Sequence, residues 1–222
     1  MAPPSQTRSA PLRVLPRGRH AAPREVVAES QRERMLVAMA DAVAEKGYAN
    51  VAVADVIERA KVSRRSFYEH YANKEECFLA ANDAGVEGML EELRRVEREA
   101  GGDRPAGARA QTAAYLQLLA DNPAFARTFL IEVLAAGPAA LTRRDAVHER
   151  FAQRLAEGYR ALAGGGSDDD STAVPQPPAY IFRAAVGAIH ELVIDHLLKH
   201  GAATLPELLD PILEIELRLL RG

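Results

Sequence analysis

The chain has 222 residues with 48% hydrophobic content, which is enough for a buried core in one or two domains. Its formal net charge of -3 indicates no particular partner, so any such signal has to come from local clusters of charge. The single cysteine, Cys77, excludes an intramolecular disulfide, and no stretch is apolar enough to predict a membrane span or a secretory signal. We therefore expect a cytoplasmic protein. Because β-branched runs and tight hairpin turns are scarce, the sequence favours an all-α fold.

The N-terminal residues 1–29 are expected to form a disordered basic tail. Residues 1–24 contain five prolines and five arginines but no acidic residue. A stretch of this kind is often only a solvated tail. The alternative is an arm that follows DNA phosphates or enters a minor groove. Both interpretations stay open on composition alone.

Residues 30–73 carry the pattern of three short helices. Ser30 and Glu33 have the spacing of a capping box, which predicts that the first helix begins there. The apolar side chains that follow repeat at helical spacing, and Gly47 stands where a C-terminal cap is expected. A second helix is predicted over residues 53–60, with Asn50 as its N-cap candidate.

The third predicted helix lies in the stretch KVSRRSFYEHYANKEE (61–76), which is rich in basic and aromatic residues. With Ser63 as the N-cap, Val62 and Phe67 have the spacing of a hydrophobic staple. Phe67 and Tyr71 lie one turn apart and should pack inward together. This arrangement buries one face of the helix and leaves its first turn exposed.

That first turn carries two adjacent arginines and a serine. In a helix-turn-helix, the N-terminal residues of the second helix meet base edges in the major groove. An arginine can donate two hydrogen bonds to O6 and N7 of guanine, and a serine can donate or accept one. Hydroxyls and cations close by can hold phosphates. The alternative is a capped surface helix with solvated charges. The candidate DNA-binding residues are Ser63, Arg64, Arg65, Ser66, Tyr68, His70 and Lys74.

Residues 30–80 resemble the DNA-binding head of the TetR family of bacterial transcriptional regulators. The resemblance is carried by Gly47-Tyr48, by VSRRSFYEHY (62–71) and by Lys74-Glu75. It implies that the two arginines and the serine touch bases, and that the tyrosine, histidine and lysine that follow hold phosphates. It also implies a homodimer that binds double-stranded DNA at a pseudo-palindromic operator.

The chain departs from the family pattern at two places before the third helix. Val51-Ala52 stands where the family has a pair of threonines, so hydroxyls that would cap the second helix are missing. Lys61 stands where the family has a turn glycine. A left-handed lysine would cost about 1 kcal/mol, which a well-packed head tolerates. Neither departure removes a predicted base contact.

Residues 74–222 are predicted to form a helical ligand-binding and dimerisation domain, which brings the expected total to about nine helices. The first long helix should end at the breaker GGDRPAG (101–107). The last should begin with the capping box Thr204–Glu207, and Pro211 should kink it or mark its start. The helices between are predicted over 108–121, 123–136, 138–163 and 179–200, with a flexible acidic loop over 164–178.

The body carries aromatic and aliphatic side chains at spacings typical of a helical core, and each is more often packing than a ligand contact. The resembled family, however, encloses a small molecule with these helices. The resemblance therefore implies an unknown small-molecule effector, and no cofactor is expected. The candidate ligand-binding residues are Met89, Leu93, Tyr115, Phe129, Phe151 and Phe182, with Glu132 and His148 as polar groups.

The last two predicted helices are apolar on more than one face, and such helices must bury more than one side. A four-helix contact between two copies would do so, and the resembled family dimerises in this way. Burial within one body is the alternative. The candidate interface residues are Ile189, Val193, Leu197, Leu209, Leu213 and Leu217.

An enzyme is the first rival class. HELVIDH (190–196) has two histidines, but a zinc-peptidase motif needs the second one at the position of Ile194. His196 and His200 share a helix face, yet two ligands alone make a poor metal site. We therefore expect no metal and no enzyme.

The sequence thus predicts a sequence-specific transcriptional regulator, nucleoid-associated when bound. We expect a repressor that a small molecule releases by changing the distance between the two reading helices of a dimer. The alternative is a helical ligand-binding or interaction protein without DNA binding. Binding to DNA distinguishes these two classes.

Overall fold

The computed structural model describes residues 24–100, 104–163 and 177–221. These residues form nine α-helices and three 3₁₀ turns without a strand, so the predicted all-α fold is confirmed. The helices are α1 (Arg24–Lys46), α2 (Val53–Ala60), α3 (Arg64–His70), α4 (Lys74–Glu99), α5 (Arg104–Asp121), α6 (Pro123–Leu130), α7 (Pro138–Ala163), α8 (Ala179–His200) and α9 (Leu209–Arg221). The 3₁₀ turns are η1 (Tyr48–Asn50), η2 (Glu132–Ala135) and η3 (Ala202–Leu208).

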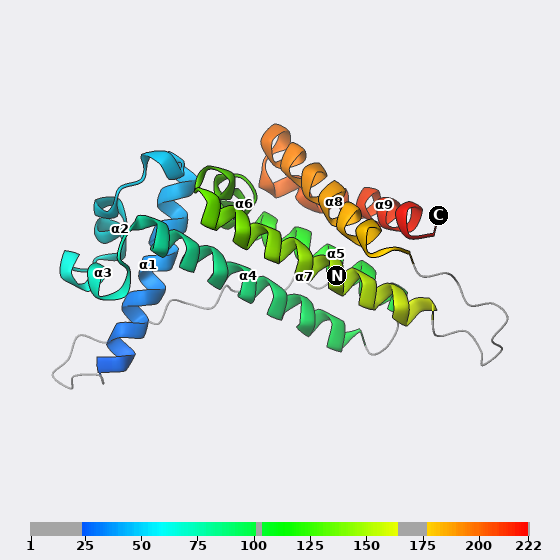
Figure 1. Ribbon diagram of the computed structural model, residues 1–222, viewed down its shortest axis with the longest axis horizontal. Coiled ribbons are helices and arrows are strands. Elements are labelled where there is room, and N and C mark those ends of the chain that lie inside the picture. Colours follow the sequence, from blue (N-terminus) through cyan, green and yellow to red (C-terminus); the bar gives the residue numbers. More distant parts are fainter. Residues whose placement is uncertain (1–23, 101–103, 164–176, 222) are drawn as a thin grey trace, which may run out of the picture.

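The helices form a small head at one end of an elongated body (Figure 1). α1, α2 and α3 make the head, and α4 runs from the head along the body. The head core fully buries Phe67 of α3 and Phe78 of α4, and it includes Val133 of η2. A second core lies within the body and fully buries leucines of α5 and α6. Each such side chain contributes about 1.5 to 3 kcal/mol by leaving water.

The first helix begins earlier than predicted. α1 starts at Arg24, directly after Pro23, so the capping box expected at Ser30 and Glu33 is wrong. Ser30 lies inside the helix, and its backbone oxygen accepts a hydrogen bond from Arg34 Nε at 3.3 Å. No glycine or proline separates residues 24 and 30, so nothing stops the helix from extending back to the proline. The tail predicted over residues 1–29 therefore loses its last six residues to α1, and its first 23 lie outside the described residues.

Three boundaries in the body also differ from the prediction. α5 begins at Arg104, so the breaker at 101–107 is shorter than expected. The helix predicted over 123–136 is divided into α6 and η2 at Ile131. The capping box expected at Thr204 is replaced by η3, and α9 starts at Leu209. Pro211 then falls in the first turn of α9, where its missing N–H costs no helical hydrogen bond. The acidic loop predicted over 164–178 lies almost wholly outside the described residues.

Candidate DNA-binding site, head–body joint and ligand-binding body

The third helix begins as the sequence predicts. Ser63 is the N-cap of α3, and its side chain accepts a hydrogen bond from the backbone N–H of Ser66 at 2.9 Å. Phe67 is fully buried and Tyr71 nearly so, and the centroids of their rings lie 5.8 Å apart in the head core. Val62, the other half of the staple, packs against the same core. The buried face therefore fixes the orientation of α3, and its opposite face is presented to solvent.

The turn between α2 and α3 depends on a contact that the sequence did not reveal. Lys61 has φ 52 and ψ 47, so it is left-handed as its position implies. Arg34 Nη1, from α1, donates to the backbone oxygen of Ala60 at 2.7 Å and to that of Lys61 at 3.4 Å. The guanidinium thus satisfies carbonyls that the C-terminus of α2 leaves without helical partners. In the sequence Arg34 is only one charge among many on an amphipathic helix.

Three of the predicted DNA-binding residues form one exposed face of α3, which we call the reading face: Arg64, Arg65 and Tyr68. The side chain of Arg65 is 89% exposed, and its Nε donates to Glu69 Oε1 at 2.9 Å. The guanidinium carbon of Arg64 lies 5.6 Å from the ring centroid of Tyr68, a cation–π distance. The exposed ion pair between Arg65 and Glu69 contributes little to stability. Arg65 can therefore leave Glu69 for a better acceptor at small cost.

Ser66 does not belong to the reading face, and its predicted exposure is wrong. Its side chain is buried, and its Oγ donates to Gln31 Oε1 of α1 at 2.6 Å. Because the helix has 3.6 residues per turn, Ser66 lies between the reading face and Phe67. α1 covers that side of α3. The hydroxyl therefore joins α3 to α1 in this structure.

Lys74 is held inside the head rather than extended into solvent. Its Nζ donates to the backbone oxygens of Tyr48 at 3.0 Å, Val51 at 2.9 Å and Ala49 at 3.4 Å. It also lies 4.6 Å from the centroid of the Tyr48 ring. Three acceptors match the three donors of an ammonium group, so a phosphate contact would require one of them to be released. His70 ends α3 and is half-buried beside Tyr71.

The second helix is capped without the threonines of the family pattern. The backbone N–H of Ala52 donates to Asp55 Oδ2 at 2.8 Å, and Lys46 Nζ donates to Asp55 Oδ1 at 2.6 Å. Asp55 thereby supplies the acidic half of a capping box. Asn50 is not the N-cap that we expected, because its side chain donates to the backbone oxygen of Lys46 and so caps the end of α1.

A buried carboxylate joins the head to the body. Glu132 Oε2 of η2 accepts a hydrogen bond from the backbone N–H of Tyr48 in η1 at 2.8 Å, and both residues are buried. Glu132 Oε1 pairs with Arg127 Nη2 of α6 at 3.1 Å. Gly47, with φ 75, lets the chain turn beside this carboxylate. Glu132, predicted as a polar group of a ligand pocket, therefore lies in this head–body joint with both of its carboxylate oxygens paired.

The predicted apolar ligand residues lie in the body interior, where they pack against the body core and against one another. Met89 and Phe129 belong to the body core, and the rings of Tyr115 and Phe151, with centroids 6.0 Å apart, pack against it. Burial raises the pKa of the Tyr115 hydroxyl. Leu93 and Phe182 are also buried, and the Phe182 ring lies 5.9 Å from Tyr159.

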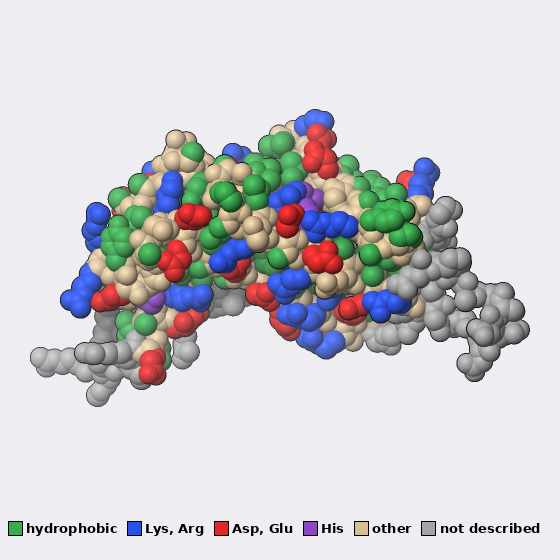
Figure 2. Space-filling model, viewed as in Figure 1, with side chains coloured by type: hydrophobic (Ala, Val, Ile, Leu, Met, Phe, Trp, Pro, Cys, Tyr) green, Lys and Arg blue, Asp and Glu red, His purple; other side chains and the backbone are tan. Residues whose placement is uncertain are grey.

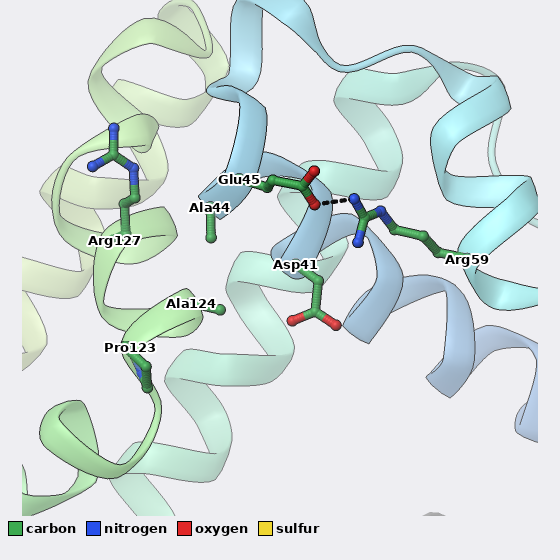
Figure 3. A pocket seen from close by; sticks show the side chains of 7 residues that line it. All are labelled: Asp41, Ala44, Glu45, Arg59, Pro123, Ala124 and Arg127. Carbon is green, nitrogen blue, oxygen red and sulfur yellow. Dashed lines mark hydrogen bonds and ion pairs between the residues drawn. The ribbon is translucent and has the colours of Figure 1, made fainter.

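Neither of two crevices on the described part of the chain is lined by a predicted ligand residue. The first, of about 450 Å³, is an open hollow between α1, α2 and α6. Figure 3 shows Arg59 bound to Glu45 at its edge and Arg127 on its far side. The second, of about 280 Å³, lies between α4 and α7 and is walled by the ion pairs Arg143–Asp83 and Arg150–Glu87.

Two buried histidines face one another between α7 and α8. The ring centroids of His148 and His190 lie 4.5 Å apart, at an interplanar angle of 67°. Burial lowers the pKa of His148 to about 4, with Arg144 and Arg183 adding to the effect. Burial, with His148 and Arg144, lowers the pKa of His190 to about 3. Both imidazoles are therefore neutral at pH 7. Only His148 was predicted as a ligand group.

The predicted dimer residues divide into two groups. Val193 is fully buried in the body core, so its assignment to an interface is wrong, and Ile189, Leu197 and Leu209 pack half-buried against the same core. Leu213 is half-buried on α9, and Leu217 is 49% exposed. Figure 2 shows hydrophobic side chains on the surface over α8 and α9. The large exposed ones on these two helices are Tyr180, Leu198, Leu217 and Leu219.

A capped third helix with an exposed basic face, a left-handed turn before it and a long helical body together define a helix-turn-helix protein. No helix within the described ranges is long and apolar enough to cross a membrane. Residues 36–81 match the family model described as bacterial regulatory proteins, tetR family. The match is to a family of regulatory proteins and not of enzymes. No curated protein is significantly similar to the chain in sequence.

Solved structures extend the likeness beyond the head. The fatty acid degradation regulator FadR from Bacillus halodurans has a TM-score of 0.71 and 17% identity, over 84% of this chain and 94% of that one. FadR from Bacillus subtilis, in complex with stearoyl-CoA, has a TM-score of 0.65 and 15% identity, over 83% and 96%. A tetR-family regulatory protein from Rhodococcus RHA1 has a TM-score of 0.63 and 21% identity, over 86% and 96%. The head thus matches the tetR family of regulatory proteins, as the resemblance predicted, and the described part of the chain has the fold of these regulators.

Proposed function

We propose that the chain is a sequence-specific DNA-binding transcriptional regulator, a repressor that a small molecule releases from its operator. The observation that carries the proposal is the reading face, where Arg64 and Arg65 stand exposed on the first turn of a capped helix within a tetR-family head. Residues 24–73 would bind DNA, and residues 74–222 would bind the effector and a second copy. A regulator of this kind works in the bacterial cytoplasm, where its operator lies.

The chemistry of the reading face suits guanine. Arg64 and Arg65 can each donate two hydrogen bonds to O6 and N7 of a guanine in the major groove. Tyr68, His70 and Lys74 are proposed to hold phosphates, and Lys74 would exchange one of its carbonyl contacts to do so. Ser66 is not proposed as a base contact, because its hydroxyl donates a hydrogen bond to Gln31.

The dimer and the effector are proposals of the same kind. Two copies would place their reading faces in successive major grooves, about 34 to 36 Å apart. The exposed apolar side chains of α8 and α9 support such a contact. FadR from Bacillus subtilis is solved with stearoyl-CoA, and we propose an effector of that acyl class for this chain. An effector that prefers a different spacing of the heads would lower the affinity for the operator.

The proposal is tested with DNA fragments that the full chain selects from a random-sequence library. Arg64→Ala or Arg65→Ala should cost about 1 to 3 kcal/mol of binding free energy and relax preference at one base pair per half-site. Arg94→Ala is the matched control, because Arg94 is a partly exposed arginine of the body that pairs with Glu91. Light scattering on the same samples gives the number of copies bound. If the double arginine variant keeps full sequence preference, the reading face is not where DNA is read.

A further inference from the structure

Three buried polar atoms belong to neighbouring side chains at the contact of α7 with α8, a group that we call the imidazole cluster: Arg144 Nε, His148 Nε2 and His190 Nε2. None of the three has a hydrogen-bond partner among the described residues. Arg144 lies one turn before His148 on α7, and its charge acts on both imidazoles. His148 and His190 are 6% and 7% exposed, so both imidazoles lie in the protein interior.

Such a group is unusual for a folded protein. At least about nine in ten buried polar groups are paired, because a buried donor without a partner loses its hydrogen bonds to water. A guanidinium N–H always donates, and a neutral imidazole with its proton on Nε2 donates there too. The imidazole cluster can therefore offer up to three donors to an oxygen-bearing ligand.

The chemistry of the cluster argues against a metal ion. A guanidinium beside the two imidazoles repels a divalent cation, and three suitable ligands are not grouped anywhere in the described part of the chain. Two histidines alone make a poor site for such an ion. The same guanidinium favours a negatively charged or strongly polar oxygen. The other arginine that acts on His148, Arg183, is already bound to Asp145 at 2.9 and 3.0 Å.

We propose that the imidazole cluster binds the acyl oxygen of the effector, which is either the carboxylate of an aliphatic acid or the carbonyl of its thioester. This inference rests on the proposed function, in which the body binds a small molecule. Phe151, less than one turn after His148, and Val193, less than one turn after His190, belong to or pack against the body core. An oxygen held by the cluster thus has an apolar interior next to it for an aliphatic chain.

The two imidazoles of the cluster lie against one another in this structure, so binding of a ligand between them would change how α7 packs on α8. The ring centroids of His148 and His190 lie 4.5 Å apart, so a ligand oxygen placed between the two rings would move α7 and α8 apart. α8 also carries part of the apolar surface proposed for the dimer. A ligand that binds only the separated state shifts the population toward that state. The distance between the heads of the two copies would then change without any contact between ligand and DNA.

The test uses the full chain without DNA and three probes: decanoate, decanoyl-CoA and the neutral decanol. Binding is measured by isothermal calorimetry. His148→Phe and His190→Phe remove the ring nitrogens and keep a ring of similar shape, and Arg144→Met keeps the stem and removes the donor. Each should weaken the binding of decanoate or decanoyl-CoA at least about tenfold, as the loss of one hydrogen bond to a charged group does. Arg143→Ala is the matched control, because Arg143 is the neighbouring residue but faces α4 and pairs with Asp83.

The outcomes separate this site from the proposed function. Binding of decanoate identifies a free acid as the ligand, and binding of decanoyl-CoA alone identifies a thioester. Equal binding of decanol, or unchanged binding by all three cluster variants, would overturn the site. Wild-type protein that binds DNA but none of the probes would also overturn it and leave the regulator intact. Wild-type protein that binds the acid but no DNA would instead contradict the proposed function.

Discussion

The head–body joint makes a prediction that can be worked from its contacts. Glu132→Ala removes the acceptor for the backbone N–H of Tyr48 and leaves that N–H buried without a partner. A hydrogen bond to a charged group contributes about 1.5 to 3 kcal/mol, and a donor stranded in the interior loses most of that. The pair with Arg127 adds less than about 1 kcal/mol, because Arg127 is 45% exposed. We expect the free energy of unfolding to fall by about 2 to 3 kcal/mol.

Glu132→Gln separates the hydrogen bond from the charge. The amide oxygen still accepts from Tyr48, so the free energy of unfolding should fall by only about 1 kcal/mol. Operator affinity should follow the same order, with the alanine variant weakest, because a head that is free to reorient spends less time in the DNA-binding arrangement.

The measurement is urea unfolding of both variants, together with operator affinity at a urea concentration of zero, where all of them are folded. Glu157→Ala, on the exposed face of α7, is the control and should change neither quantity. A loss of stability below about 0.5 kcal/mol in Glu132→Ala would refute the reasoning. So would equal effects of the alanine and glutamine variants.

Two further predictions concern the body. Because burial lowers the pKa of His148 to about 4 and of His190 to about 3, their contribution to stability is full above about pH 6.5 and is lost as the pH falls toward those values. The free energy of unfolding should drop by about 4 kcal/mol between pH 7 and pH 5, and a double phenylalanine variant with an equal drop would contradict this. Gly85→Ala should cost about 1 to 3 kcal/mol, because its Cβ would overlap the ring of Phe125. Gly88→Ala on the same helix, where a Cβ meets nothing within 4 Å, should instead stabilise by up to about 1 kcal/mol, and urea unfolding compares the two.

The head was predictable because its signals are local in the sequence. The cap at Ser63, the staple of Val62 with Phe67 and the left-handed turn at Lys61 each involve residues within a few positions of one another. Helical periodicity then assigns one face to the core, and the arginines are left on the other. The predicted start of α1 was wrong because the capping-box spacing is also only a local pattern. It does not stop a helix that can extend further toward the N-terminus.

The contacts that the sequence missed join residues far apart in the chain. Glu132 reaches Tyr48 across 84 positions, Ser66 reaches Gln31 across 35 and Arg34 reaches Ala60 across 26. Periodicity states that a residue faces inward, but not which helix covers it. The orientation of the polar side chains at the joint and in the imidazole cluster therefore depends on how the helices pack.

The surface proposed for the dimer illustrates why hydrophobicity alone does not say which face of a helix is exposed. On α8 the large side chains of Ile189, Val193 and Leu197 turn toward the chain's own core. The exposed positions between Tyr180 and Leu198 include the small residues Ala184, Gly187 and Ala188 and the charged residues Glu191 and Asp195. A ranking by hydrophobicity selects the first set, since large apolar side chains gain most from burial wherever that burial occurs. A Cβ at Gly187 would meet nothing within 4 Å, so space lies over this part of the helix. Small side chains let two helices approach closely. If two copies pair as proposed, we expect the contact on α8 to involve the exposed small residues between Tyr180 and Leu198 rather than the buried residues that hydrophobicity alone selects.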